Sequence, residues 1–307
     1  MEQIAETTRQ TYEGWDEFYA KAVDEKLDFF KIKGRIFDVI YAQQFDREFL
    51  DELCDLAEKI RLLAKTKMGA RKLSNLLPHK RAMLYFVQPS TRTFLSFQNA
   101  CFLLGLNVSE SRGTSTSSEV KGESPEDTIR TFASYVDLII SRHPEAGFAE
   151  KTSWVLNQTE RPVPVLNGGS GPDQHPTQAL LDIYTLQREF QAIGGLDGKK
   201  IAMVGDLKRG RTVRSLSYLL KNYEGVTIYS TGDESDSLYI INRGTVAVIH
   251  ENPEASKYWY TAFAVSMVGN VVSLGSRLEC DSFTTASVDP INIASALGSL
   301  FSGCPDF

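Results

Sequence analysis

Residues 89–97 are Pro-Ser-Thr-Arg-Thr-Phe-Leu-Ser-Phe, and their side chains are of the types that bind phosphate. They closely follow an apolar run at 82–87 that has the length and composition of a buried parallel strand. Ser90 is a good N-cap for a helix. The first turn of that helix would contain Thr91, Arg92 and Thr93. Unpaired N–H groups in the first turn of a helix attract anions, and the Arg92 guanidinium matches the geometry of phosphate oxygens. The string therefore predicts a phosphate-binding turn. The alternative is an ordinary capped helix.

Three other strings place charged or hydrogen-bonding side chains beside an expected strand end or helix start. In chain order they are Ser141-Arg142-His143-Pro144, His175-Pro176-Thr177-Gln178 and Gly205-Asp206-Leu207-Lys208-Arg209-Gly210-Arg211-Thr212-Val213. In isolation, His175 could cap a helix or lie at the edge of a core, and Arg211 could be a surface cation after a turn. His79, His143 and His250 have no such companions and are expected to be structural.

The elements that position these strings alternate between helix and strand. Apolar residues recur at three and four positions between about 45 and 67, which predicts an amphipathic helix before the strand at 82–87. The helix after that strand has an apolar face formed by Phe94, Phe97, Cys101 and Leu104. The polar segment 109–122 is expected to be a mobile loop, and the glycine-rich segment 168–176 could be a hinge between domains. Further helices are expected at 125–136, from Pro176 and through Leu216–Leu220, and further strands at 138–140, 162–166, 201–204 and 226–229. This order is typical of an α/β fold with a mostly parallel sheet.

Length and composition are those of a globular chain with room for two domains. The 307 residues are 42% hydrophobic and 23% charged, and the net charge of −6 favours a small anionic substrate over nucleic acid. The four cysteines form no C-x-x-C pair and have no partnered histidines, so neither a metal site nor a disulfide framework is expected. The chain has no apolar stretch of about 18 residues and no leader-like N-terminus, which predicts a cytoplasmic protein without a membrane partner.

The four strings and one further motif together resemble the carbamoyltransferase family. The further motif is Ser117-x-x-x-Lys121-Gly122-Glu123. This motif and the string at 205–213 are similar to those of aspartate carbamoyltransferase catalytic chains, whereas ornithine carbamoyltransferases carry neither. The resemblance runs from about residue 33 to 229. It implies a transferase of de novo pyrimidine biosynthesis that moves the carbamoyl group of carbamoyl phosphate to the amine of L-aspartate without a cofactor.

The resemblance and the chemistry of the side chains imply a role for each residue of the site. Carbamoyl phosphate would be bound by Ser90, Thr91, Arg92, Thr93, Arg142, His175, Gln178 and Ser117. Arg92 and Arg142 suit the phosphate dianion. His175 would donate to the carbamoyl oxygen as it becomes an oxyanion, and Gln178 would hold the carbamoyl amide. Arg92, Thr93 and His175 are the expected catalytic residues, and the amine would attack directly, with no covalent intermediate.

The resemblance also implies a homotrimer whose sites are shared between subunits. The loop with Ser117 and Lys121 would reach into a neighbouring subunit's site, where Lys121 touches both substrates. Arg211 is similar to one of the arginines that hold a carboxylate of aspartate, so Lys121 and Arg211 are the expected aspartate-binding residues. Without the resemblance, Lys121 would be an ordinary solvated surface lysine. The sequence leaves a regulatory partner chain open.

Beyond residue 229 the sequence departs from the family. The family strings T-R-x-Q-x-E-R and H-P-L-P-R, which supply a second aspartate-binding arginine and a closing loop, do not occur there. Residues 232–248 instead resemble the opening strands of a cyclic-nucleotide-binding domain, and a weak likeness extends over about 230–290. Thr284 stands where that family has a phosphate-pairing arginine, so a β-hairpin without a ligand is favoured.

The expected organisation has four parts. They are an N-terminal extension (1–32), a parallel-sheet carbamoyl-phosphate domain (33–174), a truncated second α/β domain that binds aspartate in part (175–229) and a divergent β-rich tail (230–307). The departure at 229 allows a second functional hypothesis: a non-catalytic relative that binds carbamoyl phosphate or forms oligomers, with the tail as an interaction or sensor module. A tail with no selected role is a third interpretation.

Overall fold

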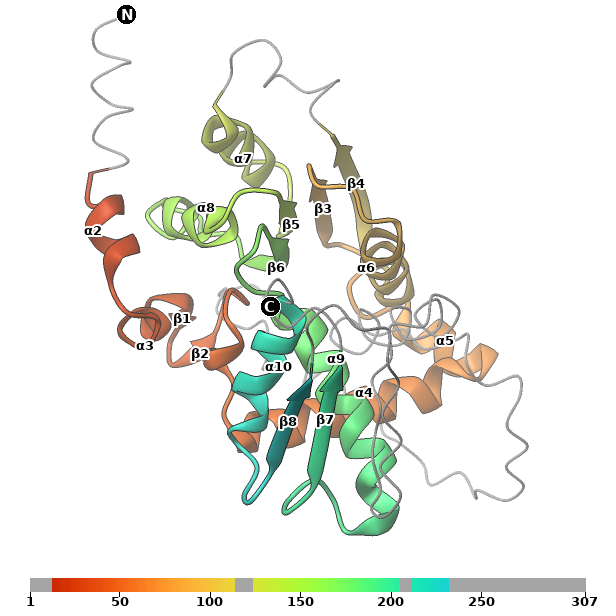
Figure 1. Cartoon of the computed structure of the whole chain (residues 1–307). Helices are drawn as coiled ribbons and strands as arrows, with labels where there is room; N and C mark the ends of the chain where they lie inside the picture. Colours follow the sequence, from red (N-terminus) through yellow and green to blue (C-terminus); the bar gives the residue numbers. More distant parts are fainter. Residues whose placement is uncertain (1–12, 114–123, 205–210, 232–307) are drawn as a thin grey trace, which may run out of the picture.

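The computed structural model describes residues 13–113, 124–204 and 211–231 of the chain (Figure 1). The N-terminal elements are α2 (Trp15–Ala20), α3 (Val23–Lys26), the 3-10 helix η1 (Leu27–Phe30), the hairpin strands β1 (Lys31–Ile32) and β2 (Arg35–Ile36), and η2 (Ala42–Gln44). The central elements are α4 (Arg47–Ala64), α5 (Lys67–Leu73), β3 (Arg81–Phe86), α6 (Thr91–Leu104), β4 (Asn107–Arg112), α7 (Pro125–Ala133), β5 (Leu138–His143), α8 (Phe148–Leu156) and β6 (Val165–Ser170). The last are α9 (Pro176–Phe190), η4 (Gln191–Ile193), β7 (Lys200–Val204), α10 (Arg211–Leu220) and β8 (Thr227–Thr231).

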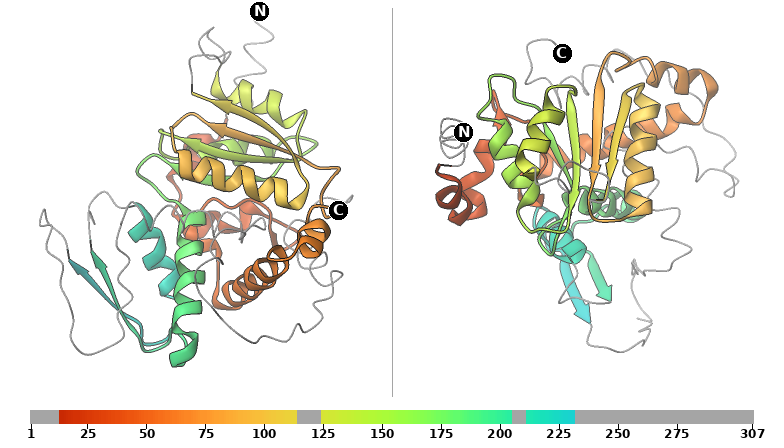
Figure 2. Two further views of the ribbon diagram at one scale, coloured as in Figure 1. Left: turned by 90° about the vertical axis from the view of Figure 1, so that its right-hand side faces the viewer. Right: turned by 90° about the horizontal axis from the view of Figure 1, so that it is seen from above.

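The main sheet is parallel and covered by helices on both faces, as the alternating pattern predicts. Its strand order is β4-β3-β5-β6. Successive residues of β3 face opposite sides: Leu84 and Phe86 belong to the core with α4, α6 and α9, whereas Met83 and Tyr85 belong to the core with α7 and α8. Figure 2 shows α6 on one face and α7 and α8 on the other. Burial on both faces explains why β3 is apolar from Ala82 to Phe86 and why β5 begins with Leu138, Ile139 and Ile140.

Two strand boundaries correct the expectations from the sequence. The polar segment expected to be a loop from residue 109 begins inside β4, which pairs in parallel with β3 from Asn107 to Arg112. β4 is an edge strand, so ladder hydrogen bonds with β3 fix it although most of its side chains are exposed. Likewise, β6 continues through Gly168 and Gly169, which were expected in the hinge, because it pairs with β5 through an irregularity between Ser141 and His143.

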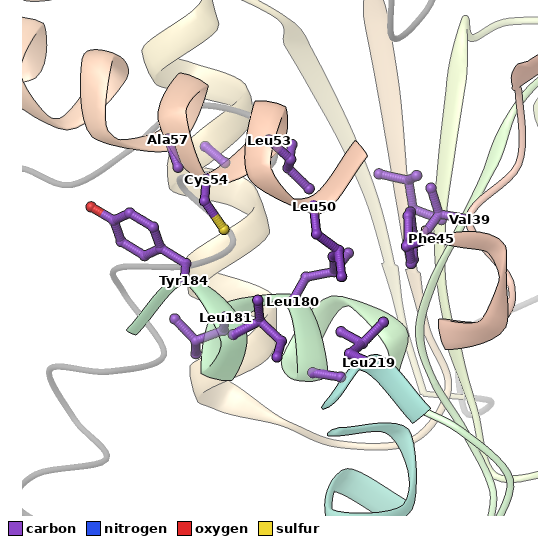
Figure 3. Close-up of a cluster of buried hydrophobic side chains, with 14 of the residues drawn as sticks. Val39, Phe45, Leu50, Leu53, Cys54, Ala57, Leu180, Leu181, Tyr184 and Leu219 are labelled. Carbon is purple, nitrogen blue, oxygen red and sulfur yellow. The ribbon is translucent and has the colours of Figure 1, made fainter. Parts of the chain in front are cut away.

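A second, two-stranded parallel sheet of β7 and β8 lies beside α9 and α10 (Figure 1). Both helices join the core of the main sheet through α4. The N-cap of α4 is Asp46, whose carboxylate accepts the N–H of Phe49 at 2.9 Å. Figure 3 shows the junction, with side chains Leu50, Leu53, Cys54 and Ala57 of α4 near Leu180, Leu181 and Tyr184 of α9 and Leu219 of α10. Burying a leucine there contributes about 1.5–3 kcal/mol. The start of α9 is therefore packed against α4 and α10.

The described part of the N-terminal extension packs into the protein through a buried ion pair. Lys26 Nζ lies 2.6 Å from Glu150 Oε1 of α8, and both side chains are 3% exposed. The other oxygen of Glu150 accepts the hydroxyl of Tyr41. Phe30, which is fully buried, packs in the same core as α8. Residues 13–32 thus contribute core side chains, and the four domain boundaries stay predictions.

No helix within the described ranges is long and apolar enough to cross a membrane. Among those same residues, no cluster of three or more His, Cys, Asp or Glu side chains could hold a metal ion. Residues 232–307 lie outside the described part, so the β-rich tail and its cyclic-nucleotide-binding likeness stay predictions.

Candidate functional site

The site lies where the strands of the main sheet end, as expected for ligands of parallel sheets. Arg142 is the fifth residue of β5 and pairs with Phe86, the last residue of β3. Just beyond β3, the N–H groups of Val87 and Gln88 donate to the carbonyl of Arg142 at 3.0 and 3.2 Å. These bonds attach the segment leading to α6 directly to Arg142. The segment that leads into α6 and Arg142, which are distant in the sequence, therefore lie side by side at the ends of β3 and β5.

Gly169, at the end of β6, is the point where three predicted site residues meet. A Cβ placed on Gly169 would lie 2.6 Å from Arg142 Nη1, 3.3 Å from His175 Cδ2 and 3.4 Å from Arg211 Cζ. Its φ of +114° is also one that L-residues rarely adopt. The backbone conformation thus favours glycine, and a methyl group here would displace the Arg142 guanidinium. The structure brings together the cationic side chains and the imidazole that the sequence analysis selected from three separate strings.

Both arginines are held by main-chain carbonyls of the loop around Gly169. Arg142 Nη1 donates to Gly168 O at 2.9 Å, and Arg211 Nη1 donates to Gly171 O at 2.6 Å. Arg211 Nη1 also lies 3.5 Å from Gln88 Oε1. Carbonyl acceptors orient a guanidinium without neutralising its charge. Two positive charges consequently stand side by side at the sheet edge, an arrangement that favours a dianion.

His175 is buried at the N-cap of α9 and is held in its neutral form. Its backbone N–H donates to Ser215 Oγ at 3.1 Å, and its Nδ1 lies 3.2 Å from Thr177 Oγ1. Burial, followed by the positive charges of Arg142 and Arg211, lowers the pKa of His175 well below its usual value. Its Nε2 has no hydrogen-bond partner among the described residues. The Thr177 hydroxyl also lies 3.5 Å from Asn167 O, farther than from His175 Nδ1. When it donates to the nearer Nδ1, the imidazole proton is on Nε2, which is then a neutral donor available to a ligand.

The first turn of α6 has the predicted position and the predicted N-cap residue, but not the predicted capping bond. Ser90 is the N-cap residue, but its side chain makes no capping bond to the helix backbone, contrary to the expectation. Ser90 Oγ instead donates to Thr93 Oγ1 at 2.9 Å, so the two hydroxyls hold each other. Thr93 is buried, and Thr91 and Arg92 are exposed. The turn therefore leaves its N–H groups uncapped by Ser90, which suits an anion-binding role.

Gln178 lies one turn into α9, where its backbone N–H donates to the carbonyl of His175 at 3.1 Å. Its side chain is 8% exposed and its Nε2 donates to Asp182 Oδ1 at 2.9 Å. Burial raises the pKa of Asp182 to about 7, while the hydrogen bond from Gln178 favours the charged form. His175, Gln178 and Asp182 thus follow one another at helical spacing along one side of α9.

Sequence reasoning missed several residues that shape the site. Asn167 Oδ1 accepts the N–H of Gly169 at 2.8 Å, and its Nδ2 donates to Ile40 O at 3.1 Å, which fixes the loop. The Arg112 guanidinium lies 3.4 Å from the centre of the Phe94 ring, at the same sheet edge. The signal for Asn167 was a polar residue inside a buried strand, directly before two glycines.

Two groups of predicted site residues fall in segments that the structure does not describe. Ser117 and Lys121 fall in 114–123, and most of the string before Arg211 falls in 205–210; both segments lie outside the described residues. Their roles stay predictions.

The model of the aspartate/ornithine carbamoyltransferase carbamoyl-P binding domain matches residues 38–188. Aspartate carbamoyltransferase 1, chloroplastic, of Pisum sativum is 46% identical over 198 residues, which cover 64% of this chain and 48% of that protein. The Methanocaldococcus jannaschii catalytic subunit is 44% identical over 62% of this chain and 58% of its own length. The Trypanosoma cruzi aspartate transcarbamoylase in complex with N-(phosphonacetyl)-L-aspartic acid superposes with a TM-score of 0.56 at 34% identity, covering 67% of this chain and 68% of that one.

The chain belongs to the aspartate carbamoyltransferase family. The resemblance stated from the sequence motifs and the predicted α/β fold are thereby confirmed. The chain spans about half the length of the curated plant relatives it matches. The pea relative covers 64% of this chain and the T. cruzi structure 67%.

Proposed function

We propose that the chain binds carbamoyl phosphate and transfers its carbamoyl group to the amine of L-aspartate. The meeting of Arg142, Arg211 and a neutral His175 around Gly169 carries this proposal. Similarity to aspartate carbamoyltransferases supports it, including a T. cruzi structure in complex with carbamoyl phosphate and aspartate at 34% identity.

Carbamoyl phosphate has a dianionic phosphate and a planar, uncharged carbamoyl group. The first turn of α6 supplies N–H groups, the hydroxyls of Ser90, Thr91 and Thr93, and the Arg92 guanidinium. Arg142 supplies a second guanidinium, held by the carbonyl of Gly168 at 2.9 Å. Cations gathered at one end fix the phosphate, and the carbamoyl group then lies toward His175 and Gln178.

The reaction needs stabilisation of an oxyanion and needs no nucleophilic side chain. The aspartate amine attacks the carbamoyl carbon, the carbonyl oxygen gains negative charge, and the C–O bond to phosphate breaks as the amine proton passes to the leaving phosphate. His175 donates from Nε2 to the developing oxyanion; a low pKa suits this role because the imidazole remains neutral and keeps one donor. Catalysis then rests on orientation and electrostatics.

Aspartate capture involves Arg211 of the same chain and Lys121 of a neighbouring subunit in a homotrimer. Arg211 stands beside Arg142, with Nη1 held at 2.6 Å from Gly171 O, so a carboxylate bound there lies next to the carbamoyl site. Ser117 of the neighbour contacts the phosphate.

Subunit sharing is tested by mixing inactive Lys121→Ala chains with inactive His175→Leu chains. Activity that reappears in the mixture supports a site shared between subunits. We also propose a cytoplasmic location; the relatives include proteins named chloroplastic.

The decisive experiment is colorimetric detection of carbamoyl-aspartate made by the purified full chain. We expect product that depends on both substrates, and at least a hundred-fold loss in Arg92→Ala, since a missing charge-assisted phosphate contact costs about 1.5–3 kcal/mol in binding and misplaces the reacting group. Arg71→Ala, which removes an exposed arginine from the last turn of α5, is the matched control and should be fully active. Absence of product at saturating substrates, with the chain folded, would contradict the proposal.

A further inference from the structure

The hydrogen bond between Gln178 and Asp182 fixes the roles of the two ends of the Gln178 amide. Gln178 Nε2 donates to Asp182 Oδ1 at 2.9 Å, one turn further along α9. Above pH 7, where Asp182 is mainly ionised, its carboxylate only accepts hydrogen bonds and can face only the NH2 end of the amide. The oxygen end is thereby left for another partner. A neutral amide at position 182 would accept either orientation of Gln178, because it both donates and accepts.

The oxygen of the Gln178 amide is available to a ligand within the described part of the chain. Gln178 Oε1 accepts no hydrogen bond from the residues described there, although the side chain is only 8% exposed. Its backbone N–H bonds to His175 O at 3.1 Å, so the side chain leaves the helix from the same turn as the imidazole. A free acceptor on the same helical turn as His175 favours a ligand group that donates a hydrogen bond.

We propose that Asp182 is a positioning residue that makes the site select a carbamoyl group over an acetyl group, by holding Gln178 Oε1 as the acceptor for the carbamoyl NH2. This inference rests on the proposed function. An acetyl group has a methyl in place of NH2, so it would cover Oε1 without donating a hydrogen bond to it. A reversed Gln178 amide would instead place its own NH2 against the carbamoyl NH2, two donors with no acceptor. Sites built around a substrate N–H reject analogues that lack it, and Asp182 supplies the orientation on which that rejection depends.

Two hydrolysis-stable probes isolate this effect. Phosphonoacetamide and 2-oxopropylphosphonate share a phosphonate and a carbonyl group and differ in carrying NH2 or CH3. Their dissociation constants, and that of inorganic phosphate, are measured by calorimetry on the full chain at a pH well above 7, where Asp182 is ionised. The variants are Asp182→Asn, Gln178→Ala and the double variant. Glu189→Gln, which removes an exposed negative charge from the same helix, is the matched control.

We expect the wild-type chain and Glu189→Gln to prefer the amide probe. Asp182→Asn should lower that preference by about ten-fold, the scale of one directed hydrogen bond, with the affinity for inorganic phosphate unchanged. Gln178→Ala should lower it at least as much. In the Gln178→Ala background, Asp182→Asn should change nothing further, because Asp182 acts through Gln178.

The outcomes separate this inference from the proposed function. If Asp182→Asn keeps the wild-type preference while Gln178→Ala loses it, Asp182 does not orient the amide and the inference is wrong, whereas the function stands. If Asp182→Asn weakens phosphate binding as much as amide binding, its role is general structure and the inference is again wrong. If the wild-type chain binds neither phosphonate, the proposed function itself fails.

Discussion

Alanine at position 169 should disrupt the site by placing a methyl group where its three central side chains meet. The added Cβ would lie 2.6 Å from Arg142 Nη1, whereas ordinary contact begins at 3.4 Å. The guanidinium must therefore retreat by about 0.8 Å, and misplacements of about 1 Å cost on the order of 10²-fold in catalysis. Weakening one charge-assisted phosphate contact of about 1.5–3 kcal/mol corresponds to a loss of at least ten-fold in phosphate affinity.

The backbone adds a separate cost, which a second glycine variant isolates. Gly169 has φ +114°, and holding an L-residue in such a region costs on the order of 1–3 kcal/mol of the free energy of unfolding. Gly194, after α9, also has positive φ (+90°), but a Cβ there meets no described atom within 4 Å. Gly194→Ala should therefore lose stability and keep the site intact.

Three measurements on both variants distinguish these effects: urea denaturation, calorimetric titration with inorganic phosphate, and carbamoyl-aspartate formation. Gly169→Ala should lower the free energy of unfolding, the phosphate affinity and the rate of product formation. Gly194→Ala should lower only the free energy of unfolding. A folded Gly169→Ala chain with wild-type phosphate affinity and turnover would refute the conclusion that the Arg142, His175 and Arg211 side chains converge on this glycine in the working site.

Three other predictions follow from buried polar groups. His175→Leu removes the Nε2–H donor and should lower kcat by about 10²–10³-fold, measured with carbamoyl phosphate and aspartate, while phosphate affinity is retained. The ring centre of His143 lies 3.8 Å from that of Phe148, and burial lowers the pKa of His143 to about 4. Between pH 6.5 and 4 the unfolded chain therefore binds a proton that the folded chain does not, so the free energy of unfolding should fall with falling pH by up to about 3 kcal/mol. Urea denaturation of His143→Phe should lack this pH-dependent loss. Lys26→Met leaves Glu150 buried and unpaired and should cost about 3–5 kcal/mol in urea denaturation.

Matched variants provide the controls. His79→Leu alters an exposed histidine and should keep full kcat; equal losses in His79→Leu and His175→Leu would argue against a specific donor. Wild-type and His143→Phe chains with parallel stability curves below pH 6.5 would show that His143 is protonated in the folded state. Lys31→Met breaks a pair with Asp28, which is 91% exposed, and should change stability by less than about 1 kcal/mol. A similar small effect in Lys26→Met would mean that Glu150 is hydrated or protonated without Lys26.

Sequence patterns predicted an element correctly where residues within that element determine its structure. The apolar run behind β3, the Pro176 start of α9 and the apolar faces of α6 and α10 were predicted because periodicity and burial follow from neighbouring residues. β4 was missed because an edge strand with polar side chains owes its form to hydrogen bonds with β3, which no local pattern reveals. The Ser90 hydroxyl was expected to cap α6, but Thr93 Oγ1 accepts it instead.

The sequence by itself determined the kinds of side chain, their order along the chain and the family. It also selected Arg142, His175 and Arg211 from separate strings. Only the tertiary structure decided that they meet at Gly169 and that the imidazole is neutral there. The physical reason is that desolvation and Coulomb interactions depend on distances between segments folded together, and sequence spacing does not contain those distances. The same holds for Asp182, an ordinary helical aspartate in the sequence, which acquires a directed contact with Gln178 only once α9 has formed and been buried.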